Sequence, residues 1–181
     1  MTGTAGTGMA GTGMAGTGTA GAGTVVIGLG NVVMSDDGLG VNAVQRLGER
    51  HRLPPDVEVV EGGTAGLLLL PYLADHPRVI IIDAIDTGAD PGTLIRLDGE
   101  EWAAMFALRM TPHDLGLADL LGAARASGAW PAELTLYGLQ PGAVELGVEL
   151  SPAVVASLDA LVDAVAAEVA EVAGAEALSC A

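Results

Sequence analysis

Residues 24–31 read Thr-Val-Val-Ile-Gly-Leu-Gly-Asn, a largely β-branched run that ends in a glycine-rich turn. An uncharged aliphatic run of this kind is typical of a strand that is covered on both faces. Ser35 or Asp36 can cap a following helix, in which apolar side chains recur at helical spacing from Val41 to Leu47. This part of the chain therefore predicts a strand, a loop and a helix.

The same alternation continues along the rest of the chain. Strands that alternate with helices favour a mostly parallel sheet with helices on both sides. The predicted fold class is therefore α/β, a three-layer α/β/α sandwich around a mostly parallel, twisted sheet. Further strands are predicted at 57–60, 79–82, 93–97 and 134–139, and further helices from about Thr64, from Thr111 and after Pro152.

The chain has the length of one compact domain with two tails. Its 181 residues can bury a core but are too few for two comfortable domains. Residues 1–23 consist of Gly, Thr, Ala and Met in near-repeats, and we expect a flexible, low-complexity tail there. We assign 24–174 to the α/β domain and 175–181 to a frayed C-terminal tail.

Composition excludes several classes of partner. Seven basic and 23 acidic residues give a net charge of −16, which phosphate backbones and anionic lipids would repel, so neither nucleic acid nor a membrane is an expected partner. No apolar stretch reaches the roughly 20 residues of a membrane span. The N-terminus resembles no secretory signal, and the single cysteine, Cys180, forms no internal disulfide. We expect a cytoplasmic, monomeric protein.

Three side chains are candidates for the chemistry. Asp37 follows the first strand, Asp83 ends the aliphatic run at 79–82, and His113 stands at the start of a helix. The loops after parallel strands meet at one edge of the sheet, so we expect the three to converge there. Two carboxylates about 4 Å apart repel by roughly 4 kcal/mol at a dielectric of 20 unless a proton or cation lies between them. One imidazole with two carboxylates suits zinc or nickel.

Each of these residues also has an ordinary structural interpretation. Asp36 and Asp37 could only cap a helix, Asp83 could be a solvated turn residue, and His113 could simply occupy a helix start. A dinucleotide-binding protein is a further alternative, but the third glycine of that fingerprint falls on Val33. An aspartic dyad of Asp37 and Asp83 is another alternative, because paired carboxylates can share a proton and activate water.

Five short motifs follow one another along the chain, at 28–31, 36–41, 61–66, 83–84 and 111–117. In sequence and in order they resemble the motifs of the hydrogenase-maturation endopeptidases, which trim the C-terminus of the nickel-iron hydrogenase large subunit. With the closing helix, the resemblance extends over about residues 24 to 172. One departure stands out, since the motif at 61–66 usually opens with aspartate and here opens with Glu61.

The resemblance implies an endopeptidase that removes a short C-terminal peptide from the nickel-loaded large-subunit precursor. Nickel, supplied by the substrate, would be the recognition signal, and zinc or cadmium could substitute in vitro. A non-catalytic nickel-dependent assembly chaperone is the alternative within the same biology. The resemblance places the metal-binding and catalytic residues at Asp37, Asp83 and His113, and the substrate-binding residues at Glu61, Gly63 and Thr64.

Overall fold

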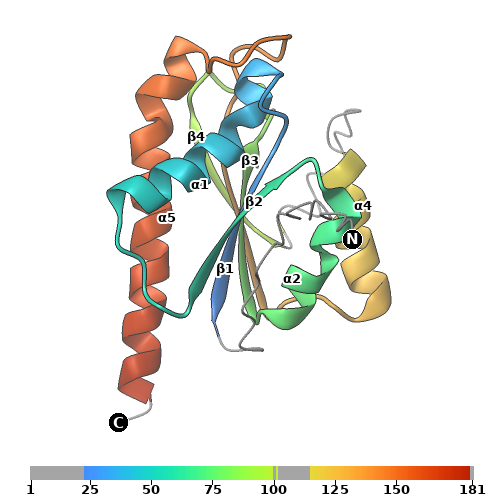
Figure 1. The fold of residues 1–181 in the computed structure, drawn as a ribbon, viewed down its shortest axis with the longest axis vertical. Helices are drawn as coiled ribbons and strands as arrows, with labels where there is room; N and C mark the ends of the chain where they lie inside the picture. The colour runs from blue at the N-terminus through green and yellow to red at the C-terminus, as the bar shows by residue number, and fades with distance from the viewer. Residues whose placement is uncertain (1–22, 100, 102–114, 180–181) are drawn as a thin grey trace, which may run out of the picture.

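The computed structural model of the protein describes residues 23–99, 101 and 115–179 (Figure 1). Its elements confirm the alternation of strands and helices. In chain order they are β1 (Thr24–Leu29), the 3-10 helix η1 (Ser35–Gly38), α1 (Leu39–Arg50), β2 (Val57–Gly63), the 3-10 helix η2 (Gly66–Leu69), α2 (Leu70–Asp75), β3 (Arg78–Ala84), β4 (Leu94–Asp98), α4 (Leu115–Ser127), β5 (Glu133–Leu139) and α5 (Pro152–Ser179).

The five strands form one sheet in the order β2-β1-β3-β5-β4. The first four are parallel, and β4 runs antiparallel to β5 at the edge of the sheet. The mostly parallel sheet predicted from the sequence is therefore confirmed. From β1 the chain crosses first to β2 on one side and later to β3 on the other, so the loops beyond β1 and β3 diverge. Ligands of open α/β sheets bind at such a point.

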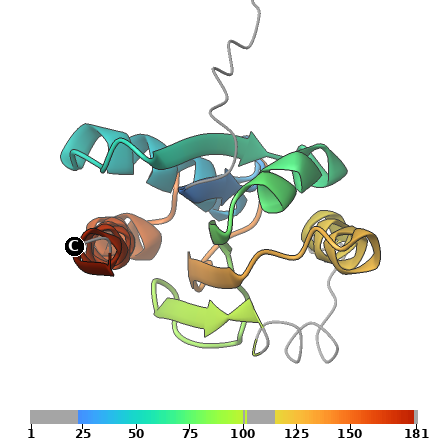
Figure 2. The ribbon, with the colours of Figure 1, turned by 90° about the horizontal axis from the view of Figure 1, so that it is seen from below.

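Helices cover both faces of the sheet. Figure 2 shows α1 and α5 on one face and α2 and α4 on the other. Alternate residues of the central strands supply two apolar clusters, with Ile27 and Ile81 in the cluster under α2 and α4, and Ile80 and Ile82 in the cluster under α1 and α5. The central strands β1 and β3 are buried on both faces, which explains why they read as continuous aliphatic runs.

Two glycines bring the start of α1 close to the ends of the central strands. A Cβ atom at Gly28 would lie 2.2 Å from the carbonyl oxygen of Gly40, and one at Gly40 would lie 2.1 Å from the carbonyl oxygen of Ile82. Any larger residue at either position would push α1 away from β1 and β3. The close approach places the η1 segment directly beyond these strands.

Some predicted boundaries differ from the structure. The helix expected from about Thr64 begins as α2 at Leu70, after the 3-10 helix η2, because Pro71 lacks an N–H donor and fits only in the first turn of an α-helix. Helix α5 continues to Ser179, into the segment for which we expected fraying, and the run Ala-Glu-Ala-Leu at 175–178 consists of strong helix formers. The helix start predicted at Thr111 lies outside the described residues.

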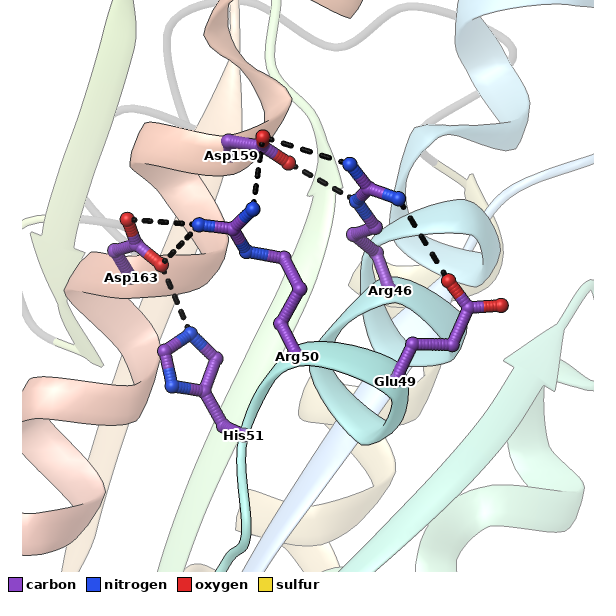
Figure 3. Close-up of polar contacts among 6 residues, drawn as sticks. All are labelled: Arg46, Glu49, Arg50, His51, Asp159 and Asp163. Atoms are coloured by element: carbon purple, nitrogen blue, oxygen red, sulfur yellow. Dashed lines mark hydrogen bonds and ion pairs between the residues drawn. The ribbon is translucent and has the colours of Figure 1, made fainter.

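An exposed ionic network joins α1 to α5 (Figure 3). Arg46 and Arg50 both bind the Asp159 carboxylate, each with an N–O distance of 3.0 Å. The Asp163 carboxylate accepts a hydrogen bond from Arg50, and its Oδ1 atom lies 2.8 Å from the His51 Nε2 atom. Below this network the helices pack through apolar residues such as Leu47 and Val162. Among the described residues, no helix combines the length and apolar character needed to cross a bilayer.

Candidate active site

A cavity of about 200 Å³ opens at the carboxyl edge of the sheet, beyond β1 and β3. Its walls come from the loops after β1, β2 and β3 and from the first turns of α4. Two carboxylates, those of Asp37 and Asp83, face a lining that is otherwise mostly glycine and leucine. The lining residues are Leu29, Gly30, Asp37, Gly63, Thr64, Gly66, Leu69, Asp83, Gly116, Leu117 and Leu120.

Asp37 is held at the cavity by the turn that precedes it. Its Oδ2 atom accepts a hydrogen bond from the backbone N–H of Asn31 at 2.9 Å. Gly30, just before, has a φ of +107°, and a Cβ there would lie 1.6 Å from the carbonyl oxygen of Asp37. Only glycine fits this position. The glycine-rich turn therefore fixes both the backbone and the carboxylate of Asp37.

The neighbouring Asp36 carboxylate is fully buried and binds backbone N–H groups of a distant loop. Its Oδ2 atom accepts from the N–H groups of Gly142 and Ala143 at 2.8 and 2.9 Å, and its Oδ1 atom from the N–H of Ser151 at 2.6 Å. Burial raises the pKa of Asp36, but these hydrogen bonds outweigh it and hold the pKa below its ordinary value. Asp36 thus ties η1 to the loop before α5.

This assignment corrects the expectation that Ser35 or Asp36 caps α1. The N-cap position of α1 is Gly38, and no side chain caps it. The Ser35 hydroxyl instead donates to the carbonyl oxygen of Glu145 at 3.1 Å. Both side chains point to a loop more than 100 residues away in sequence, and that distant partner takes the place of a local helix cap.

Backbone hydrogen bonds complete the attachment of this loop, residues 140–151. The Ser35 N–H donates to the carbonyl oxygen of Gly147 at 2.8 Å, the Gly147 N–H to Val33 at 3.0 Å, and the Asp36 N–H to Ala143 at 3.1 Å. Ser35 adopts a φ of +49°, which a non-glycine residue rarely adopts and which these bonds stabilise. The segment carrying Asp37 is therefore held by several hydrogen bonds to the 140–151 loop.

Asp83 occupies the end of β3, where it pairs with Gly138 of β5. Its Oδ1 atom accepts from the N–H of Ala84 at 2.8 Å, which orients the carboxylate. A Cβ at Gly138 would lie 2.3 Å from the carbonyl oxygen of Asp83, so glycine at that position allows β5 to lie close to β3. The structure thus brings Asp37 and Asp83 to one cavity, as the sequence predicted.

The third predicted ligand, His113, lies outside the described residues. Within the described part of the chain, no three His, Cys, Asp or Glu side chains gather closely enough to hold a metal ion. His113 precedes Gly116 by three residues, a separation that an extended chain spans in about 10 Å. Gly116 lines the cavity. The complete set of Asp37, Asp83 and His113 remains a prediction.

The structure separates the three residues for which the resemblance implied substrate binding. Gly63 and Thr64 line the cavity, whereas the exposed Glu61 side chain accepts a hydrogen bond from the Gln45 Nε2 atom of α1 at 3.2 Å. A bulge causes the separation, because Glu61 pairs with Gly28 while Gly63 pairs with the next residue of β1. Glu61 therefore projects toward α1 and lies outside the lining of this cavity.

The glycine-rich turn after β1 is already occupied by the protein's own backbone. The Cβ positions of Gly28 and Gly30 would collide with the carbonyl oxygens of Gly40 and Asp37. In a dinucleotide-binding turn the glycines make room for a pyrophosphate. Here they make room for η1 and α1, so this geometry does not favour the dinucleotide alternative.

Two features of the site were not predicted from the sequence. The apolar wall formed by Leu29, Leu69 and Leu117 was not predicted, because leucines of this kind are indistinguishable from core residues in a sequence. The attachment of the 140–151 loop to Asp36 was also missed. The one local signal for it is the polar Gln-Pro-Gly at 140–142 directly after a buried strand.

Comparison with known proteins identifies the family. Residues 41–168 match the family model described as hydrogenase maturation protease. The chain is 41% identical over 148 residues to the hydrogenase 2 maturation protease of Escherichia coli K12, which covers 81% of this chain and 90% of that protein. It is 42% identical over 137 residues to the hydrogenase expression/formation protein HupD of Rhodobacter capsulatus, covering 75% and 65% respectively.

Solved structures give the same result. The hydrogenase maturating endopeptidase HybD from Escherichia coli superposes with a TM-score of 0.76 at 40% identity, over 82% of this chain and 93% of that one. The [NiFe] hydrogenase maturation protease HybD from Thermococcus kodakarensis gives a TM-score of 0.67 at 29% identity, over 79% and 96%. The chain therefore belongs to the hydrogenase maturation protease family and is a peptidase.

Proposed function

We propose that this peptidase removes a short C-terminal peptide from the nickel-loaded precursor of a nickel-iron hydrogenase large subunit. The observation that carries the proposal is the pair Asp37 and Asp83 at one cavity of a chain from the hydrogenase maturation protease family. Both carboxylates are oriented by backbone N–H groups, so they are positioned before a substrate arrives. Nickel would enter as part of the substrate.

In this proposal Asp37, Asp83 and His113 complete the coordination of the substrate's nickel and thereby recognise a loaded precursor. Two carboxylates and an imidazole are suitable ligands for a divalent metal of this kind. The net charge of −16 also favours the approach of a cation. Zinc or cadmium would occupy the same ligands in vitro.

Hydrolysis requires a group that takes a proton from the attacking water. As the water oxygen bonds to the scissile carbonyl carbon, a carboxylate accepts its proton and then returns it to the leaving amine as the C–N bond breaks. Asp37 and Asp83 line the cavity and Glu61 does not, so we assign this proton transfer to the aspartate pair. Gly63 and Thr64, at the end of β2, would contact the extended substrate segment.

The test is to incubate the purified protein with nickel-loaded and nickel-free precursor and to follow the precursor's mass. We expect a product shortened at its C-terminus only from the nickel-loaded precursor. Shortening of the nickel-free precursor at the same rate would refute nickel recognition. Nickel-dependent binding without any shortening would instead support the chaperone alternative. Monomeric state and cytoplasmic location stay predictions.

A further inference from the structure

Exposed apolar side chains gather beside the candidate active site. Of the ten large hydrophobic residues that are exposed in the described part of the chain, five lie in two short loop segments at the carboxyl edge of the sheet. We call these five the apolar rim. Its members are Val32, Val33, Val144, Leu146 and Val148.

The two segments of the apolar rim lie side by side. Met34 and Gly147 form a parallel β-bridge, and the Gly147 N–H donates to the carbonyl oxygen of Val33. In Figure 1 the loop that leads into α5 lies next to the segment that leads into α1, at the top of the view. The two segments of the rim are therefore neighbours on the surface although they lie more than 100 positions apart in sequence.

The apolar side chains of the rim are exposed although their loop is hydrogen-bonded to the rest of the protein. Leu146 is 86% exposed and Val148 is 72% exposed, yet their loop is fixed by the Asp36 carboxylate and by backbone bonds to η1. Exposed apolar residues gathered on neighbouring, hydrogen-bonded segments are typical of a protein-protein contact.

The position of the rim indicates which protein covers it. The rim segment at 32–33 immediately precedes η1, and η1 carries Asp37 at the cavity. On the far wall of the cavity, the exposed Leu67 and Leu68 lie between the lining residues Gly66 and Leu69. The folded body of a protein whose peptide segment enters the cavity would therefore lie next to this edge.

We infer that the apolar rim is the docking surface for the folded body of the substrate, a large-subunit precursor that presents an apolar patch bordered by basic residues. This inference rests on the proposed function. The basic border follows from the exposed Glu145 and Glu149, which alternate with the apolar residues of the rim. Docking through the rim raises the local concentration of the scissile segment at Asp37 and Asp83.

The experiment compares the wild-type protein with L146Q/V148Q and with a control, V59T. Val59 is also exposed but lies in the edge strand β2, outside the rim. We expect L146Q/V148Q to weaken precursor binding, measured by interferometry, at least about 10-fold, because central apolar contacts dominate such interfaces. We expect the same rise in KM with kcat within about twofold. V59T should match the wild type.

The outcomes separate this inference from the proposed function. Cleavage by the wild type with an unchanged Kd and KM in L146Q/V148Q would overturn the docking surface and leave the protease assignment intact. Absence of cleavage by the wild type would count against the proposed function, while a lower affinity of L146Q/V148Q for the precursor would still support the docking surface. A wild-type dimer that L146Q/V148Q converts to a monomer would assign the rim to a second copy and overturn the inference.

Discussion

The carboxyl edge of the sheet and the outer face of α1 and α5 use carboxylates in opposite ways. At the carboxyl edge, Asp36 and Asp37 accept hydrogen bonds from backbone N–H groups, which orient a carboxylate without cancelling its charge. On the outer face, Asp159 and Asp163 meet arginine and histidine side chains in an exposed network (Figure 3). The edge therefore retains negative charge where a cation could bind.

The lowered pKa values of the carboxylates in these two regions also have different causes. Hydrogen bonding to Arg46 lowers the pKa of Asp159, and hydrogen bonding to His51 lowers that of Asp163, but both carboxylates stay in solvent that screens them. The pKa of Asp36 is lowered despite complete burial. All three pKa values are lowered. For Asp36 the shift reflects buried hydrogen bonds that hold two segments together, whereas for Asp159 and Asp163 it reflects weak contacts at the surface.

The largest expected effect comes from the cavity carboxylates. D37N and D83N each keep an oxygen that can accept the existing backbone hydrogen bond, but they remove the negative charge. We expect the rate of precursor processing to fall at least about 100-fold, or about 2.7 kcal/mol in the barrier. The melting temperature should stay within a few degrees of the wild type. A variant that processes the precursor at the wild-type rate would exclude its aspartate from the chemistry.

The next effect concerns stability at Asp36. D36N replaces one acceptor oxygen by an NH₂ group, which then faces a buried backbone N–H of Ser151 or of Gly142 and Ala143. We expect a loss of about 2 kcal/mol in the free energy of unfolding, measured by urea denaturation, because a buried donor is left without an acceptor. D37N is the matched control. If D36N were as stable as D37N, the hydrogen bonds of the Asp36 carboxylate would contribute nothing measurable to the free energy of unfolding.

Lowering the pH should remove the contribution of Asp36 to the free energy of unfolding. Since the pKa of Asp36 is lower in the folded protein than in the unfolded chain, its contribution is complete above the ordinary value of 3.8 and is lost as pH falls through the folded value. Urea midpoints measured between about pH 5 and pH 3 should therefore fall more steeply for the wild type than for D36N. Parallel curves would contradict this assignment.

The smallest effect is expected on the outer face. D159N removes the carboxylate shared by Arg46 and Arg50, but all three side chains are substantially exposed. We expect the melting temperature to change little, and the residual difference to vanish in about 0.5 M salt, where the Debye length is only a few ångströms. A destabilisation as large as that of D36N would remove the contrast between the two regions.

Most of the fold could be predicted because its information is local. The run at 79–82 is aliphatic because a central strand is covered on both faces, so its composition alone predicts the strand. The loops after parallel strands necessarily reach one edge of the sheet. The structure has both Asp37 and Asp83 in the lining of the cavity on that edge. The orientation of Glu61 could not be predicted, because the bulge that turns it toward α1 leaves no mark in the sequence beyond a pair of glycines.

The role of Asp36 was unpredictable for a different reason. Its partners Gly142 and Ala143 lie 106 and 107 residues further along the chain, and they offer backbone N–H groups, which every residue except proline has. A local cap was therefore the simpler expectation for this carboxylate. The position of His113 relative to the cavity stays a prediction from the resemblance and from chain proximity to α4.

Anomalous diffraction from crystals soaked in a cadmium salt would test the convergence of the three ligands most directly. We expect a single strong peak at the carboxyl edge, bonded to carboxylate oxygens of Asp37 and Asp83 and to an imidazole nitrogen of His113. A peak bound elsewhere, or a peak at the aspartates from which the His113 imidazole is turned away, would contradict the proposed metal-recognising site.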